Sequence, residues 1–163
     1  MTNLNFINSI KGRVFGGIYG KILHIHNNDD ELIIHCSEPL ISLHSSQGDK
    51  DDRFWSFDWD ELKTGEDTLL INEQNTPEPL EYEVIESPSQ SYIISASSYY
   101  TRKNLIKEVS AYGFFESNVK RITSIVIKLE DSYIHIEASP AIEIRITNKK
   151  PTIEGDLSLI VSL

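Results

Sequence analysis

Hydrophobic and polar residues alternate most regularly over residues 119–147. Ile125, Ile127 and Leu129 are spaced two apart, and Ile134 and Ile136 continue the same spacing after an acidic turn. Alternation with a period of two, in a run rich in β-branched residues, predicts antiparallel strands with one buried face. If Leu129 lies opposite Ser132, Ile127 faces Ile134 and Ile125 faces Ile136. A shift of one residue would expose every one of these isoleucines.

A third strand follows Pro140, which interrupts the pairing because proline has no backbone donor. Residues 21–44 repeat the same order of basic residue, strand, acidic turn, strand, proline and strand. We therefore expect two similar three-stranded units, at 21–44 and 121–147. The alternative is that two unrelated β-meanders share this order.

The rest of the chain adds further strands and one helix. Strands are predicted at 54–60, 67–72, 80–85, 92–96 and 157–163. Residues 1–10 fit either a short helix or an extended lead-in. The glycines of segment 12–20 do not match a phosphate-binding loop and favour a bent strand.

The main helix is predicted near residues 100–112. Thr101 is a suitable N-cap, Leu105, Ile106 and Val109 form an apolar stripe, and Gly113 is a suitable C-cap. The fold class expected is β-rich: mainly β with this one main α-helix, arranged as an antiparallel sandwich, half-barrel or bent sheet. A chain of 163 residues is expected to form a single domain, 1–163.

The sequence also favours a cytoplasmic protein. Its apolar runs are too short to span a membrane, and the first residues lack a basic region followed by an apolar core. Cys36 is the single cysteine, which excludes an internal disulfide and fits a reducing compartment.

Negative charge is concentrated in one part of the chain. The net charge is −10, and residues 29–86 contain 17 acidic side chains against Lys50, Arg53 and Lys63. Such a surface repels phosphate, so we do not expect nucleic-acid binding. It would instead attract a basic protein partner.

Eight residues are the candidate contacts to that partner. Acidic side chains would supply the charge, and tryptophans, which dominate many interfaces, would supply an apolar anchor. The candidates are Asp49, Asp51, Asp52, Trp55, Asp58, Trp59, Asp60 and Glu61. The alternative for the stripe formed by Trp55, Phe57 and Trp59 is that these rings belong to the core.

Histidines give a weaker candidate site. His24 and His26 point the same way on one predicted strand, and pairing of His26 with Glu31 would bring Glu31 and His35 to the same face. Histidines so arranged can bind zinc. The alternative is a polar face without metal, and we expect neither a metal nor another cofactor.

The sequence contains no catalytic motif that we can identify. A Gly-x-Ser-x-Gly elbow, a His-Glu-x-x-His motif and paired cysteines are all missing. His35 and Cys36 are neighbours on a strand and so point to opposite faces. We therefore do not expect an enzyme.

The leading hypothesis is a small acidic intracellular domain that neutralises or sequesters a basic partner protein. Immunity proteins, which block a cognate toxin, fit this description as a class. One alternative is a small-ligand or metal-binding β domain that uses the face of His24, His26 and His35. Others are a structural or oligomerisation module and an enzyme with its site in the mouth of a β-barrel. The sequence does not set the oligomeric state.

Overall fold

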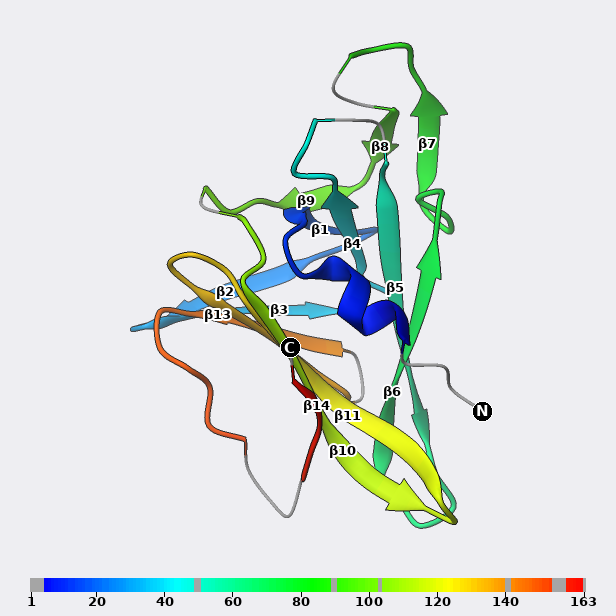
Figure 1. Cartoon of the computed structure of the whole chain (residues 1–163), viewed down its shortest axis with the longest axis vertical. Coiled ribbons are helices and arrows are strands. Elements are labelled where there is room, and N and C mark those ends of the chain that lie inside the picture. Colours follow the sequence, from blue (N-terminus) through cyan, green and yellow to red (C-terminus); the bar gives the residue numbers. More distant parts are fainter. Residues whose placement is uncertain are drawn as a thin grey trace.

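The computed structural model describes residues 5–48, 51–88, 91–102, 104–139, 142–153 and 158–162. Strands make up 58% of the chain and helix 4%, and the antiparallel sheets are not closed into a barrel. The mainly-β prediction is therefore confirmed as a sandwich or bent sheet (Figure 1).

Two antiparallel sheets contain most of the strands, and their orders are β6–β5–β4–β1–β9 and β14–β10–β11–β12–β13–β3–β2. The strands of the five-stranded sheet are β1 (Val14–Gly20), β4 (Leu40–His44), β5 (Arg53–Glu61), β6 (Asp67–Gln74) and β9 (Ser97–Tyr99). Those of the seven-stranded sheet are β2 (His24–Asn28), β3 (Glu31–Cys36), β10 (Glu108–Glu116), β11 (Val119–Lys128), β12 (Tyr133–Glu137), β13 (Ile142–Thr147) and β14 (Ser158–Ser162).

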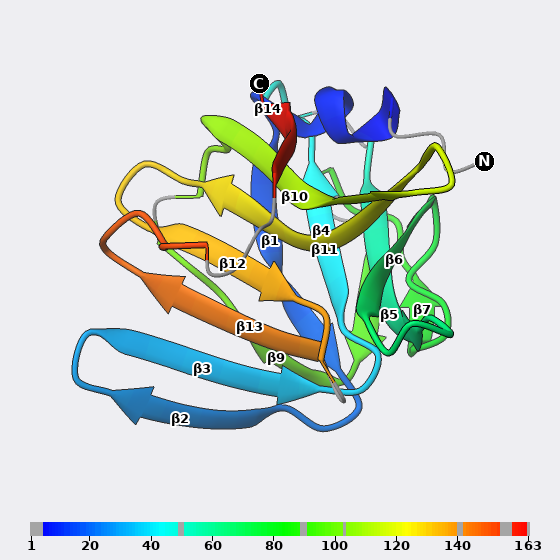
Figure 2. The same cartoon turned by 90° about the horizontal axis from the view of Figure 1, so that it is seen from below.

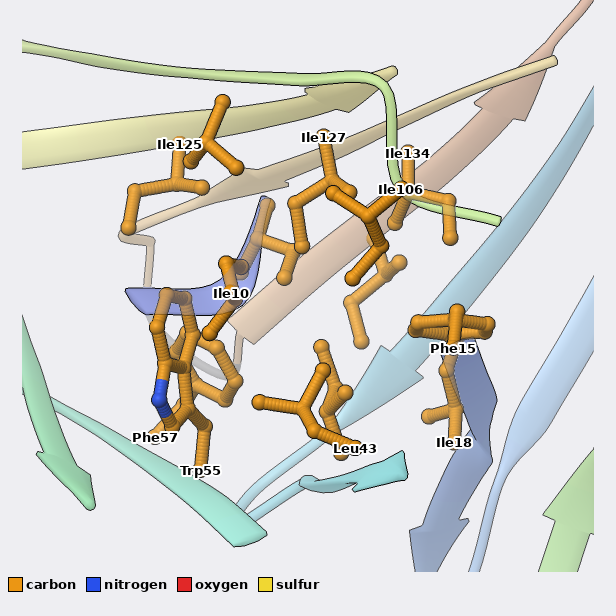
Figure 3. Close-up of a cluster of buried hydrophobic side chains, with 14 of the residues drawn as sticks. Ile10, Phe15, Ile18, Leu43, Trp55, Phe57, Ile106, Ile125, Ile127 and Ile134 are labelled. Atoms are coloured by element: carbon orange, nitrogen blue, oxygen red, sulfur yellow. The ribbon is translucent and has the colours of Figure 1, made fainter. Parts of the chain in front are cut away.

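The two sheets enclose the main hydrophobic core. Strands of the seven-stranded sheet run across those of the five-stranded sheet (Figure 2), and side chains from both inner faces meet between them (Figure 3). A short 3₁₀ helix, η1 (Asn5–Ile10), adds Ile7 and Ile10, both fully buried. Interdigitation of two inner faces is how crossed sheets bury their apolar residues.

The predicted register of the first hairpin in 119–147 is confirmed. Ile127 pairs with Ile134 and Ile125 with Ile136, and the amide of Leu129 donates to the carbonyl of Ser132 over 2.8 Å. These four isoleucines are completely buried. The hydrophobic pattern excludes any odd shift, which would move all four to the outer face, and the position of the turn selects among the even shifts.

The prediction of two similar three-stranded units is wrong for the first of them. Strands β11, β12 and β13 lie next to one another in one sheet, whereas β2 and β3 pair with each other and β4 lies in the opposite sheet. Pro39, before β4, is buried, and its carbonyl accepts the amide of Phe57. Between β3 and β4 the chain therefore crosses from one sheet to the other, whereas between β12 and β13 it stays in the same sheet.

The prediction of a helix near 100–112 is also wrong. Leu105 makes an isolated bridge to Val14, and β10 pairs with β11 along its whole length. Gly113 lies at a register shift in this pairing rather than at a helix end. Pairing with strands distant in sequence has overridden the local helical signal, as tertiary context often does.

A separate hairpin covers part of the outer face of the five-stranded sheet. It consists of β7 (Glu81–Val84) and β8 (Tyr92–Ser95). Leu40, Phe54 and Leu80 form a second, smaller core beneath it, with Tyr92 and Ile94 packed against them. Among the helices of the described residues, none has the length and apolarity needed to cross a membrane.

Candidate functional site

The seven predicted contact residues that the structure describes do not lie on one surface. Asp49 is outside the described residues. Asp51 is exposed, but its carboxylate lies 2.6 Å from the guanidinium of Arg13 and 3.6 Å from that of Arg53. The hydrogen bond from Arg13 holds the pKa of Asp51 below its ordinary value. Asp51 is thus already paired within the chain and adds little negative potential.

The side chain of Asp52 is largely covered rather than exposed. Its side chain is only 7% exposed, and its Oδ1 lies 2.6 Å from Nδ1 of His44. Asp52 is therefore paired within the chain and offers little exposed charge to a basic partner.

The aromatic stripe belongs to the core, as the alternative interpretation held. Trp55 is 0% and Phe57 1% exposed, and Trp59 is partly buried against the same cluster. The ring of Phe6 from η1 packs edge-on against Trp55, with 5.4 Å between ring centroids. The indole nitrogen of Trp55 donates to Oε2 of Glu73 over 3.0 Å. Trp55 is therefore not a surface anchor.

Besides Asp51, the exposed acids among the described predicted contacts are Asp58, Asp60 and Glu61, all in the second half of β5. Asp58 lies on the outer face opposite Leu70 of β6, and Leu70 is 45% exposed. These two residues, together with Glu38 and Pro79, line a groove of about 200 Å³. We call it the acidic groove. It places two exposed carboxylates beside exposed apolar surface.

Further exposed carboxylates lie close in sequence to Pro79, which lines the acidic groove. Glu78, Glu81 and Glu83, around the groove residue Pro79, are all exposed. Among the described residues that line the groove, none is lysine or arginine. No cationic side chain among these lining residues therefore offsets the carboxylates of Glu38 and Asp58.

The histidine face is present but is arranged differently from the expectation. His24 pairs with His35 and His26 with Ile33, so the register differs by two residues from the predicted pairing of His26 with Glu31. The rings of His26 and His35 lie 5.3 Å apart between centroids. In the described part of the chain, no group of three or more His, Cys, Asp or Glu side chains is arranged to hold a metal ion.

His35 instead takes part in an ion-pair network on the outer face of the seven-stranded sheet. Its Nε2 lies 3.1 Å from Glu143, which also accepts a hydrogen bond from Arg145. Arg145 additionally approaches Glu31 at 3.7 Å. Although burial opposes it, hydrogen bonding from Arg145 and His35 holds the pKa of Glu143 below its ordinary value.

One constellation was missed by the sequence analysis. Oγ of Ser42 lies 3.1 Å from Nε2 of His44, and Nδ1 of His44 lies 2.6 Å from Asp52. All three side chains line a pocket of about 230 Å³ whose walls include Tyr19 and Tyr92. A serine, a histidine and a carboxylate in this order are the elements of nucleophilic acyl-transfer sites.

A partial signal for this constellation was present in the sequence. Ser42 and His44 are two apart in a predicted strand, so they share a face. The position of Asp52 depends on the loop that joins β4 to β5, which no periodic pattern specifies.

Comparison with known proteins does not assign a function to these sites, because no family model, curated protein or solved structure matches the chain.

Proposed function

We propose that this protein is an acidic interaction domain whose acidic groove binds a lysine or arginine side chain of a basic partner protein. The observation that supports this most directly is the pairing of exposed carboxylates, Glu38 and Asp58, with the exposed apolar side chain of Leu70 in one groove.

Such a groove matches the two parts of a long basic side chain. Lysine and arginine carry an aliphatic stem that packs on apolar surface and a charged head that remains polar. The stem would lie over Leu70 and Pro79, and the head would donate to Glu38 and Asp58. Hydrogen bonds between oppositely charged groups are about twice as strong as neutral ones.

The charge of the whole chain supports the same partner. A net charge of −10 steers a basic protein toward the acidic side and suppresses acidic competitors. By covering the basic surface of its partner, the domain would neutralise or sequester it, in the manner of an immunity protein or inhibitor.

We place this activity in the cytoplasm. The chain has one cysteine, and Cys36 is buried, which raises the pKa of its thiol. A buried thiol of raised pKa is unreactive toward disulfide exchange and needs no oxidising compartment.

The test is capture of a partner from host lysate by the tagged protein, followed by elution with increasing salt and mass identification. The variant Glu38→Gln/Asp58→Asn removes the two groove charges. Its matched control is Asp29→Asn/Asp30→Asn, which removes the same charge from two exposed residues at the turn between β2 and β3.

We expect the wild type and the control to capture a basic protein in stoichiometric amount. The groove variant should fail to retain the same protein. Capture of no basic protein, or equal capture by both double variants, would show that the acidic groove is not the binding surface.

A further inference from the structure

A second feature of the molecule is the pocket lined by Ser42, His44 and Asp52. We propose that this pocket is a hydrolytic site in which Ser42 is the nucleophile, His44 its general base and Asp52 the group that orients His44, acting on a small neutral ester. The two sites share no lining residue in the described part of the chain.

The backbone arrangement brings the three side chains together. Ser42 and His44 point to the outer face of β4, and Asp52 immediately precedes β5, which pairs with β4 from Leu43 opposite Arg53. The contact of 2.6 Å between Asp52 and Nδ1 of His44 requires the ring proton on Nδ1, because an ionised carboxylate can only accept. Nε2 then presents its lone pair to the hydroxyl of Ser42, 3.1 Å away.

Gly16 of β1 leaves the space that the side chains of Ser42 and His44 occupy. A Cβ atom at position 16 would lie 2.3 Å from Nε2 of His44 and 2.8 Å from Oγ of Ser42. Gly16 also sits at the irregularity in the pairing of β1 with β4. Any larger residue would therefore push His44 away from Ser42, and glycine is required here for close approach.

The pocket walls define the class of ligand. They include Phe54, Ile94 and the three tyrosines Tyr19, Tyr92 and Tyr100, so the acyl group should be apolar. The described lining contains no lysine or arginine, which disfavours an anionic substrate. A volume of about 230 Å³ is below the usual range for drug-sized ligands. Ser42 is only 2% exposed, so a ligand must enter the pocket to reach it.

Tyr19 and Tyr100 offer a hydrogen-bond donor in the same pocket. Their hydroxyls lie 2.9 Å apart. One of the two hydroxyl protons makes this contact, and the other is left for an oxygen of the ligand. Burial raises the pKa of Tyr19, so its hydroxyl remains protonated and able to donate.

The reaction balances with water as the only co-reactant. Oγ of Ser42 bonds to the acyl carbon while its proton passes to Nε2 of His44, which then protonates the departing alcohol as the ester C–O bond breaks. Water next attacks the acyl-serine and gives a proton to His44, which returns it to Ser42. The products are a carboxylic acid and an alcohol, and no group is oxidised or reduced.

Diisopropyl fluorophosphate is a suitable probe because it is small and neutral and bonds to activated serines with loss of fluoride. We expect one adduct by intact mass, located at Ser42 by peptide mapping of the wild-type protein. p-Nitrophenyl acetate should be hydrolysed by the wild type and not by Ser42→Ala. His44→Ala should slow both reactions by about 100-fold, with recovery on adding imidazole.

The positioning roles have separate readouts. Asp52→Asn should lower kcat for p-nitrophenyl acetate with KM unchanged, and Gly16→Ala should abolish labelling while the circular dichroism spectrum is retained. Glu38→Gln/Asp58→Asn should label normally, which separates this proposal from the partner-binding one. Absence of an adduct under conditions that label a reference serine hydrolase fully, or an adduct at another residue, would overturn the proposal.

Discussion

Trp55 combines complete burial with a hydrogen bond to the carboxylate of Glu73. Replacement by phenylalanine removes the donor and leaves part of the indole volume empty. Losing a hydrogen bond to a charged group and creating a small cavity should together lower the free energy of unfolding by about 2–4 kcal/mol. Urea unfolding followed by circular dichroism measures this loss.

The matched control is Trp59→Phe, since Trp59 is only partly buried and lies four residues further along the same strand. Its cost should be below about 1 kcal/mol. Equal losses in the two variants would contradict the assignment of Trp55 to the core, and with it the exclusion of Trp55 from the binding surface.

His135 makes stability depend on pH. It is 7% exposed, and its Nε2 has no hydrogen-bond partner among the described residues. Burial, with the nearby charge of Arg145, lowers the pKa of His135 from its ordinary value of 6.5 to about 4. Between these values the unfolded chain binds a proton that the folded chain does not, so stability falls as pH decreases from about 6.5 to 4.

The variant His135→Leu removes this titration. Relative to the variant, the wild type should lose on the order of 3 kcal/mol between pH 7 and pH 4, measured by urea unfolding at each pH. The acidic side chains titrate in both proteins, so their contribution largely cancels in the difference. Parallel pH profiles of the two proteins would show that His135 does not titrate below its ordinary range.

At the level of elements, β14 protects β10 from being an edge of the seven-stranded sheet. β10 pairs with β14 from Ser110 to Gly113. Ending the chain after residue 157 would expose the backbone donors and acceptors of β10, and exposed edges promote association between sheets. We expect a loss of about 2–4 kcal/mol in unfolding free energy and a concentration-dependent increase in mass by light scattering.

Leu159→Ser is the control for this truncation. Leu159 is 54% exposed, and its replacement leaves the backbone pairing in place, so stability should change by less than about 0.5 kcal/mol. A truncated chain as stable and as monomeric as this control would mean that β14 contributes nothing to the sheet.

The elements differ in how far the sequence determines them. The hairpin of β11 and β12 was predicted correctly because burial of Ile125, Ile127, Ile134 and Ile136 excludes every odd shift, and the acidic turn after Leu129 selects among the even ones. The structure of segment 100–112 was not predictable, because Leu105, Ile106 and Val109 fit a helical stripe as well as they fit an extended chain. Pairing with β1 and β11 makes this segment extended, and the local spacing of residues carries no information on that pairing.

At the level of the whole molecule, the excess of acid in residues 29–86 was visible in the sequence, but its distribution over the surface was not. Arg13 is distant in sequence from Asp51 and pairs with it, and Asp52 pairs with His44 and is little exposed. Glu38 also lines the acidic groove but was not among the candidates. It is distant in sequence from Asp58, and only the fold brings the two residues to one groove. A charge count therefore predicts the sign of the charge on the partner but not the residues that contact the partner.

The central claim is that charge on the acidic groove binds a basic protein, and the salt dependence of the affinity tests it most directly. With the captured partner, we expect the affinity of the wild type to fall at least about tenfold from low salt to about 0.5 M, because salt screens exposed charges. Glu38→Gln/Asp58→Asn should bind more weakly at low salt and respond less to added salt. An affinity that is independent of salt, or a groove variant with the wild-type salt dependence, would contradict the account.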